Sequence, residues 1–200
     1  MPNPAEAEEN LRVIRSLMEK ATVYRAISAP GALIGGGLAV ASSVLCARSA
    51  YFSEPINFLL LWITVLAITG SVNFAFIWRE AKKRGDPFIS PGMRMAFFAV
   101  VPSYLLAAYY TLRWGIFTSE VVRIWIICHG LGLLATSHFA PRSFTWLGWA
   151  FLLSGIVACE SWVALSNPTW MALTFGLFHL IYAAFTWPRK APAPVPAFES

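Results

Sequence analysis

The chain has 200 residues, of which 58% are hydrophobic and only 12% are charged. A water-soluble domain of this size cannot cover its surface with so few charged groups, so the composition predicts an integral membrane protein. The net charge of +5 does not indicate nucleic-acid binding, because the basic residues are divided among segments that flank apolar runs. They form no basic stripe interleaved with aromatic side chains, and we expect no nucleic-acid partner.

Residues 1–27 predict an amphipathic helix that lies along the membrane interface. Their apolar side chains fall on one arc of a helix with 3.6 residues per turn, and their charged side chains fall on the opposite arc. Acidic and basic residues balance here, whereas a helix held by anionic lipid normally carries an excess of Lys and Arg. The helix is either a collar that stabilises the bundle or a contact for a partner protein or second copy through Arg12, Arg15 and Glu19.

Six apolar segments follow, each close to the roughly 20 residues that span about 30 Å of hydrocarbon. Helix caps mark several starts, namely Ser90–Pro91, Ser119 and Asn167–Pro168. The connections are short, so consecutive helices are expected to pack as antiparallel neighbours in three hairpins, 28–78, 91–140 and 143–187. Whether the hairpins are true repeats stays open. The predicted spans are 28–47, 56–78, 92–112, 120–139, 144–163 and 168–187.

The sequence therefore predicts an all-α membrane protein, a six-helix transmembrane bundle over residues 28–187, followed by a Pro- and Ala-rich tail at 188–200. Basic residues are unevenly divided between the two ends of these spans, which places both termini in the cytoplasm. We expect a multi-pass protein of the bacterial inner membrane. The predicted cytoplasmic end holds Arg12, Arg15, Lys20, Arg25, Arg79, Lys82, Lys83, Arg84, Arg94, Arg142, Arg189 and Lys190, and the other end holds Arg48, Arg113 and Arg123.

The first span carries a stripe of small residues at every fourth position, namely Gly31, Gly35, Ala39 and Ser43. Such a stripe allows two helix backbones to approach closely. It predicts either packing inside one bundle or a seam between two copies of the chain.

Two histidines are predicted to point into the bundle at nearly the same depth. His129 lies about 13 Å and His179 about 16 Å below the outer starts of helices that run in the same direction. His129 and His138 are nine residues apart on opposite faces of one helix, so they cannot share a metal ion. A pair of imidazoles at one level suits six-coordinate haem b, but it also suits structural or gating hydrogen bonds, or contact with a small ligand.

Other candidate sites are few. Arg123 and Glu160 lie at the outer ends of neighbouring spans, so an ion pair between them is the simplest account of charges at that depth. The three cysteines are not clustered and lie in apolar stretches, which is typical of small buried side chains rather than a metal site. We find no pattern typical of a catalytic site or of a resident metal.

The stretches "ENLRVIRSLMEKATVYRA", "APRSFTWLGWAFLLSG" and "FGLFHLIYAAF" resemble an uncharacterised family of bacterial six-helix integral membrane proteins over most of the chain. The resemblance implies an inner-membrane protein and brings no catalytic residues. The sequence as a whole favours a non-catalytic accessory, sensory or small-ligand-binding membrane subunit, in contact with the lipid bilayer and able to join an oligomer or larger complex. The alternative functions are a cytochrome b that binds haem through His129 and His179, and a small transporter that acts as an oligomer.

Overall fold

The computed structural model describes residues 6–15, 29–85, 89, 91–114, 118–137, 142–160 and 162–187, and these are almost entirely helical. The helices are α2 (Ala29–Arg48), the short 3₁₀ turn η1 (Ala50–Ser53), α3 (Pro55–Arg84), α4 (Pro91–Trp114), α5 (Thr118–Ala135) and α6 (Arg142–Cys159). A last continuous helix is made of α7 (Asn167–Met171), the π-helical η3 (Ala172–Phe178) and α8 (His179–Thr186).

Six helices of the described chain are long and apolar enough to cross a membrane, which confirms the six predicted segments. The largest difference in length is in α3, which continues to Arg84 rather than ending at residue 78. It ends where Gly85 takes a left-handed conformation, with φ of 69°, and donates its N–H to the carbonyls of Ala81 and Lys82. The predicted end followed the loss of apolar residues, whereas the backbone stays helical through the charged residues up to this glycine.

The starts of two other helices differ by one residue from the predicted caps. The last helix begins after Ser166, whose hydroxyl accepts from the backbone N–H of Thr169, so Ser166 and not Asn167 is the cap. The Asn167 amide instead donates to the Thr118 hydroxyl at 3.2 Å and joins the start of this helix to the start of α5. Ser119 lies inside α5, and Ser90 is outside the described residues.

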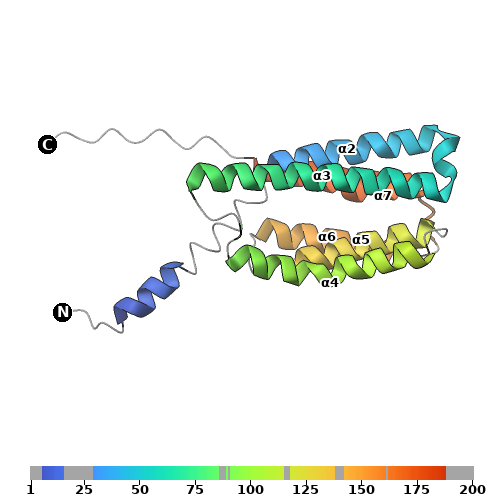
Figure 1. Cartoon of the computed structure of the whole chain (residues 1–200). Coiled ribbons are helices and arrows are strands. Elements are labelled where there is room, and N and C mark those ends of the chain that lie inside the picture. The colour runs from blue at the N-terminus through green and yellow to red at the C-terminus, as the bar shows by residue number, and fades with distance from the viewer. Residues whose placement is uncertain are drawn as a thin grey trace.

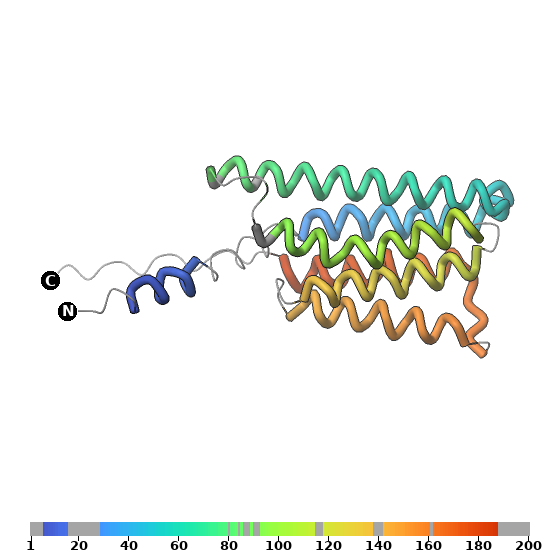
Figure 2. The backbone as a smooth tube through the Cα atoms, turned by 60° about the horizontal axis from the view of Figure 1, so that its bottom comes forward, coloured from blue at the N-terminus to red at the C-terminus, as the bar shows by residue number. Residues whose placement is uncertain are grey.

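The helices are arranged in two layers (Figure 1). One layer holds α2, α3 and the last helix, and the other holds α4, α5 and α6; Figure 2 shows the same bundle from a second direction. The closest packing is between α5 and α6 and between α4 and α5, while α2 packs chiefly on the last helix and then on α3. The hairpin predicted over residues 143–187 is therefore wrong in its main contacts, because α6 packs chiefly on α5 and the last helix chiefly on α2.

Glycines explain these partners, because they let backbones approach where a larger side chain would collide. A Cβ added to Gly36 of α2 would lie 3.0 Å from the carbonyl oxygen of Gly176 in the last helix. A Cβ added to Gly130 of α5 would lie 2.6 Å from the backbone nitrogen of Leu152 in α6. Both seams therefore depend on missing side chains.

The predicted stripe of α2 is buried inside the bundle of a single chain. Gly31, Gly35, Ala39 and Ser43 are all buried, and a Cβ on Gly35 would lie 2.7 Å from Cγ2 of Thr69 in α3. Packing within one chain thus accounts for the stripe without a second copy.

Residues 6–15 form a helix in which every residue is exposed, including the apolar Leu11, Val13 and Ile14. Arg12 lies 3.5 Å from Glu9 in an exposed ion pair one turn away. Glu19 and the tail at 188–200 lie outside the described residues, so the predicted partner surface at Arg12, Arg15 and Glu19 stays a prediction.

Candidate functional site

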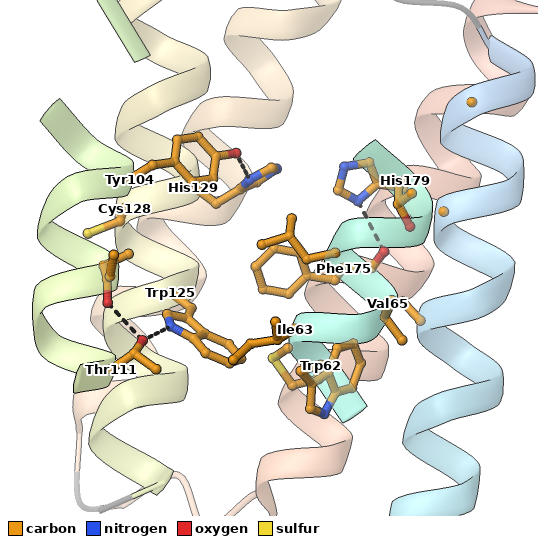
Figure 3. Close-up of a pocket in the computed structure, with 18 of the residues that line it drawn as sticks. Trp62, Ile63, Val65, Tyr104, Thr111, Trp125, Cys128, His129, Phe175 and His179 are labelled. Carbon is orange, nitrogen blue, oxygen red and sulfur yellow. Dashed lines mark hydrogen bonds between the residues drawn. The ribbon is translucent and has the colours of Figure 1, made fainter. Parts of the chain in front are cut away.

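A pocket of about 410 Å³ lies between the two helix layers, with walls from α2, α3 and the last helix on one side and from α4 and α5 on the other (Figure 3). Its walls are almost wholly apolar. They include the aromatic side chains Trp62, Trp125 and Phe175, while Tyr104, His129 and His179 supply most of the polar atoms near one end. None of the described residues that line the pocket is acidic, and none is Lys or Arg.

The pocket reaches the lateral surface of the bundle. Three of its lining side chains are themselves strongly exposed: Ile63 at 46%, Leu66 at 60% and Leu112 at 88%. Ile63 and Leu66 belong to α3, which packs chiefly on α2, and Leu112 belongs to α4, which packs chiefly on α5. The rim between α3 and α4 is therefore apolar and lies on the side of the bundle rather than at its polar ends.

The opposite end of the pocket from the histidines in Figure 3 is held by hydrogen bonds between α4 and α5. The Trp125 indole N–H donates to the Thr111 hydroxyl at 2.8 Å, and that hydroxyl donates to the carbonyl of Ala107 at 2.8 Å. Both polar groups are satisfied, so this end presents the apolar face of Trp125 to the pocket.

His129 of α5 has one engaged and one unengaged ring nitrogen. Its Nδ1 lies 2.8 Å from the phenolic oxygen of Tyr104 in α4. Its Nε2 is buried with no hydrogen-bond partner. A buried polar nitrogen without a partner is costly in an apolar setting, so Nε2 marks a place where the ligand or a water can bond.

His179 is held by its own helix. Its Nδ1 lies 3.1 Å from the carbonyl oxygen of Phe175, which belongs to the π-helical segment η3. A carbonyl oxygen only accepts, so Nδ1 carries the proton and Nε2 has a free lone pair. Single π-helical turns are frequent at functional sites, and this one sets the position of His179 in the pocket wall.

The two imidazoles are neighbours, with ring centroids 5.5 Å apart and planes inclined by 53°. Figure 3 shows each ring pointing its Nε2 edge toward the other across the end of the pocket. The two histidines that the sequence set at one depth on separate helices thus lie side by side in the structure.

The surroundings of this pair do not fit haem b. The iron would lie between the two Nε2 atoms, and the porphyrin would extend about 5 Å from it in the plane between the two rings. The Phe151 ring lies 4.5 Å from His129 and 5.4 Å from His179, so its centroid is about 4 Å from the midpoint of the pair. The Phe175 ring also contacts both imidazoles, at 5.1 and 6.4 Å. Two phenylalanines therefore occupy the space that the macrocycle needs.

The predicted ion pair between Arg123 and Glu160 is replaced by a nearer one. Arg123 Nη1 lies 2.7 Å from Oε1 of Glu120, one turn earlier on α5. Residues three apart on one helix are already neighbours, so this pair forms without any contact between helices. His138 is outside the described residues, and the parts of the chain that the structure describes hold no cluster of three metal-ligating side chains.

Sequence reasoning missed Tyr104 and the small residues of α5 and α6. Nothing in a single sequence shows which face of α4 meets α5, so a tyrosine in an apolar span has no distinguishing signal until the two helices are packed.

None of the protein-family models, curated proteins or solved structures compared with the chain matches it. The class of protein is therefore defined by its own fold and pocket. It is an all-helical protein with six helices able to cross a membrane and an apolar pocket between two helix layers.

Proposed function

We propose that this is a multi-pass membrane protein that binds a small, largely apolar ligand in the pocket between its two helix layers, as a sensory or accessory subunit. The observation that carries the proposal is the pocket itself, about 410 Å³ in volume, with an apolar rim between α3 and α4. Pockets of roughly 300–1,000 Å³ with apolar walls and a few converging polar groups are typical small-molecule sites.

The membrane setting is supported by the side chains near the helix ends. Exposed tryptophans lie at both ends of the bundle, with Trp78, Trp146 and Trp187 at one end and Trp162 at the other. Lys82 places its ammonium group 5.3 Å from the ring centre of Trp78. Tryptophan and basic residues concentrate at membrane interfaces, and the larger number of basic residues at the end with Trp78 favours cytoplasmic termini in a bacterial inner membrane.

The position of the rim implies a route for the ligand. In a bilayer, the exposed side chains of Ile63, Leu66 and Leu112 face lipid tails rather than water. A ligand that partitions into the membrane therefore reaches the pocket laterally, without crossing a polar surface. The haem alternative has less support, because Phe151 and Phe175 occupy the space of the macrocycle.

The test is saturable binding of an apolar probe to the protein in lipid nanodiscs. We choose 4-hexylanisole, a ring with a short tail and no hydrogen-bond donor, and subtract its partition into empty nanodiscs. The variant Ala108→Trp places a large side chain at a position that lines the pocket, and the control Leu105→Trp makes the same addition on α4 at an exposed residue outside the pocket.

We expect one saturable site in the unmodified protein and in Leu105→Trp. Ala108→Trp should weaken binding at least about tenfold, because the added ring competes for the same volume. Equal saturable binding in Ala108→Trp, or no saturable binding in the unmodified protein, would refute the proposed function.

A further inference from the structure

The two histidines that face each other in the pocket differ in where they hold their proton. His179 donates its Nδ1–H to the Phe175 carbonyl, so its Nε2 can only accept a hydrogen bond. With no acidic side chain among the described lining residues, an imidazolium would be unpaired in apolar surroundings, so both rings are uncharged.

The contact with Tyr104 decides the proton position on His129. If His129 Nδ1–H donated to the phenolic oxygen, the Tyr104 hydrogen would need a second acceptor, and the only side-chain bond printed by the geometry for this hydroxyl is the one to His129. If Tyr104 donates to Nδ1, that hydrogen is satisfied and the imidazole proton lies on Nε2. A buried hydroxyl favours the arrangement that uses its hydrogen, so His129 presents an Nε2–H donor.

The gap between the two rings therefore has a donor on one side and an acceptor on the other. The Nε2 of His129 is buried and unpartnered, so the two rings do not bond each other directly. Their Nε2 edges point toward one another, with the ring centroids 5.5 Å apart. A single polar atom that both accepts and donates completes this arrangement.

We propose that the pocket selects ligands that carry a hydroxyl group, an alcohol or a phenol, held between His129 and His179. The hydroxyl oxygen accepts from His129 Nε2–H, and the hydroxyl hydrogen is donated to His179 Nε2. This inference rests on the proposed function and specifies the ligand class of the same pocket. The rest of the ligand lies against the apolar walls formed by Trp62, Trp125 and Phe175.

Other polar groups match the pair less well. A ketone or an ether accepts but does not donate, so it leaves His179 Nε2 unpaired. A carboxylate or an ammonium group brings a charge into a pocket whose described lining has no counter-charge, at a large desolvation cost. A water molecule has the right donor and acceptor pattern, and a ligand hydroxyl displaces it without losing either bond.

Tyr104 acts in this scheme as a positioning residue. It does not touch the ligand hydroxyl, but its own hydroxyl fixes the proton of His129 on Nε2. Without the tyrosine hydroxyl, the ring loses the partner that selects its tautomer, and the preference for a hydroxyl over an ether falls.

The experiment compares 4-hexylphenol with its methyl ether, 4-hexylanisole, on the protein in lipid nanodiscs. The two probes share the ring and the tail and differ in the hydroxyl hydrogen. We expect the phenol to bind at least about tenfold more tightly in the unmodified protein. In His129→Phe, His179→Phe and Tyr104→Phe the ratio of the two dissociation constants should approach one, while binding of the ether persists.

The control variant is Thr64→Val, which removes a hydroxyl of α3 that bonds the Leu60 carbonyl outside the pocket, and it should keep the ratio. ¹⁵N resonances of the imidazoles provide a second measurement, with a proton expected on Nε2 of His129 and on Nδ1 of His179. Equal binding of the two probes at a site that Ala108→Trp blocks would overturn the hydroxyl inference and leave the proposed function standing. Absence of saturable binding by either probe would overturn both. A proton on Nδ1 of both rings would overturn the inference as well.

Discussion

The seam between α5 and α6 depends on Gly130, and the substitution Gly130→Ala tests this dependence. The added methyl group would lie 2.6 Å from the Leu152 nitrogen and 2.9 Å from the Gly148 oxygen, where ordinary contact begins near 3.4 Å. Both neighbours are backbone atoms, so no side-chain rotation relieves the collision. The two helices must therefore separate locally by about 0.8 Å.

Two opposing effects set the magnitude. Alanine is favoured over glycine inside a helix by about 0.8–1.0 kcal/mol, which would stabilise the variant. A gap of 0.5–1 Å forfeits roughly a quarter to a half of each van der Waals contact along the seam, and overpacking typically costs about 1–3 kcal/mol. Because α5 and α6 form the most extensive contact in the bundle, we expect a net loss of at least about 2 kcal/mol in the free energy of unfolding.

The assay is unfolding in mixed micelles, with the mole fraction of SDS increased and the helix content followed by circular dichroism. Gly70→Ala is the matched control, because a Cβ there meets nothing within 4 Å. This control should be unchanged or up to about 1 kcal/mol more stable. If Gly130→Ala unfolds at the same SDS fraction as Gly70→Ala, the close approach of the two backbones is not what holds the seam.

Three further predictions concern the ends of the chain and of α3. Gly85→Ala should destabilise the end of α3 by about 1–2 kcal/mol, because φ of 69° is strained for alanine; an unchanged unfolding curve would contradict this. A reporter enzyme that works only outside the cytoplasm should stay inactive when fused after Lys190, and activity would show that the charge-based topology is inverted or that a span is miscounted. Reversing both charges of a predicted contact, Arg15→Glu with Glu19→Arg, keeps any pair between them but inverts the pattern offered to a partner. We expect loss of an associated subunit or of the oligomer on size-exclusion chromatography with the monomer still folded, whereas retained association would leave only the collar role.

The sequence alone determined the number of apolar helices and most of their boundaries. Apolar length and helix caps are local properties, and six predicted segments correspond to six helices. Local properties fail where the backbone follows a different signal from the side chains, as in α3, which continues through charged residues to Gly85. The common depth of His129 and His179 was also predictable, because the rise of a helix per residue is fixed.

Only the tertiary structure decided which helices pack together and what surrounds each histidine. Between helices in lipid there is no hydrophobic driving force that selects a partner, so close packing of small residues at distant positions makes the choice. Gly36 meets Gly176 across the bundle, and Gly130 meets the backbone of α6, although the sequence drew attention to a different stripe. The same packing brings Tyr104 to His129 and two phenylalanines against the histidine pair. The depth of the pair was therefore fixed by local geometry, but its chemistry was fixed by contacts between residues far apart in the chain.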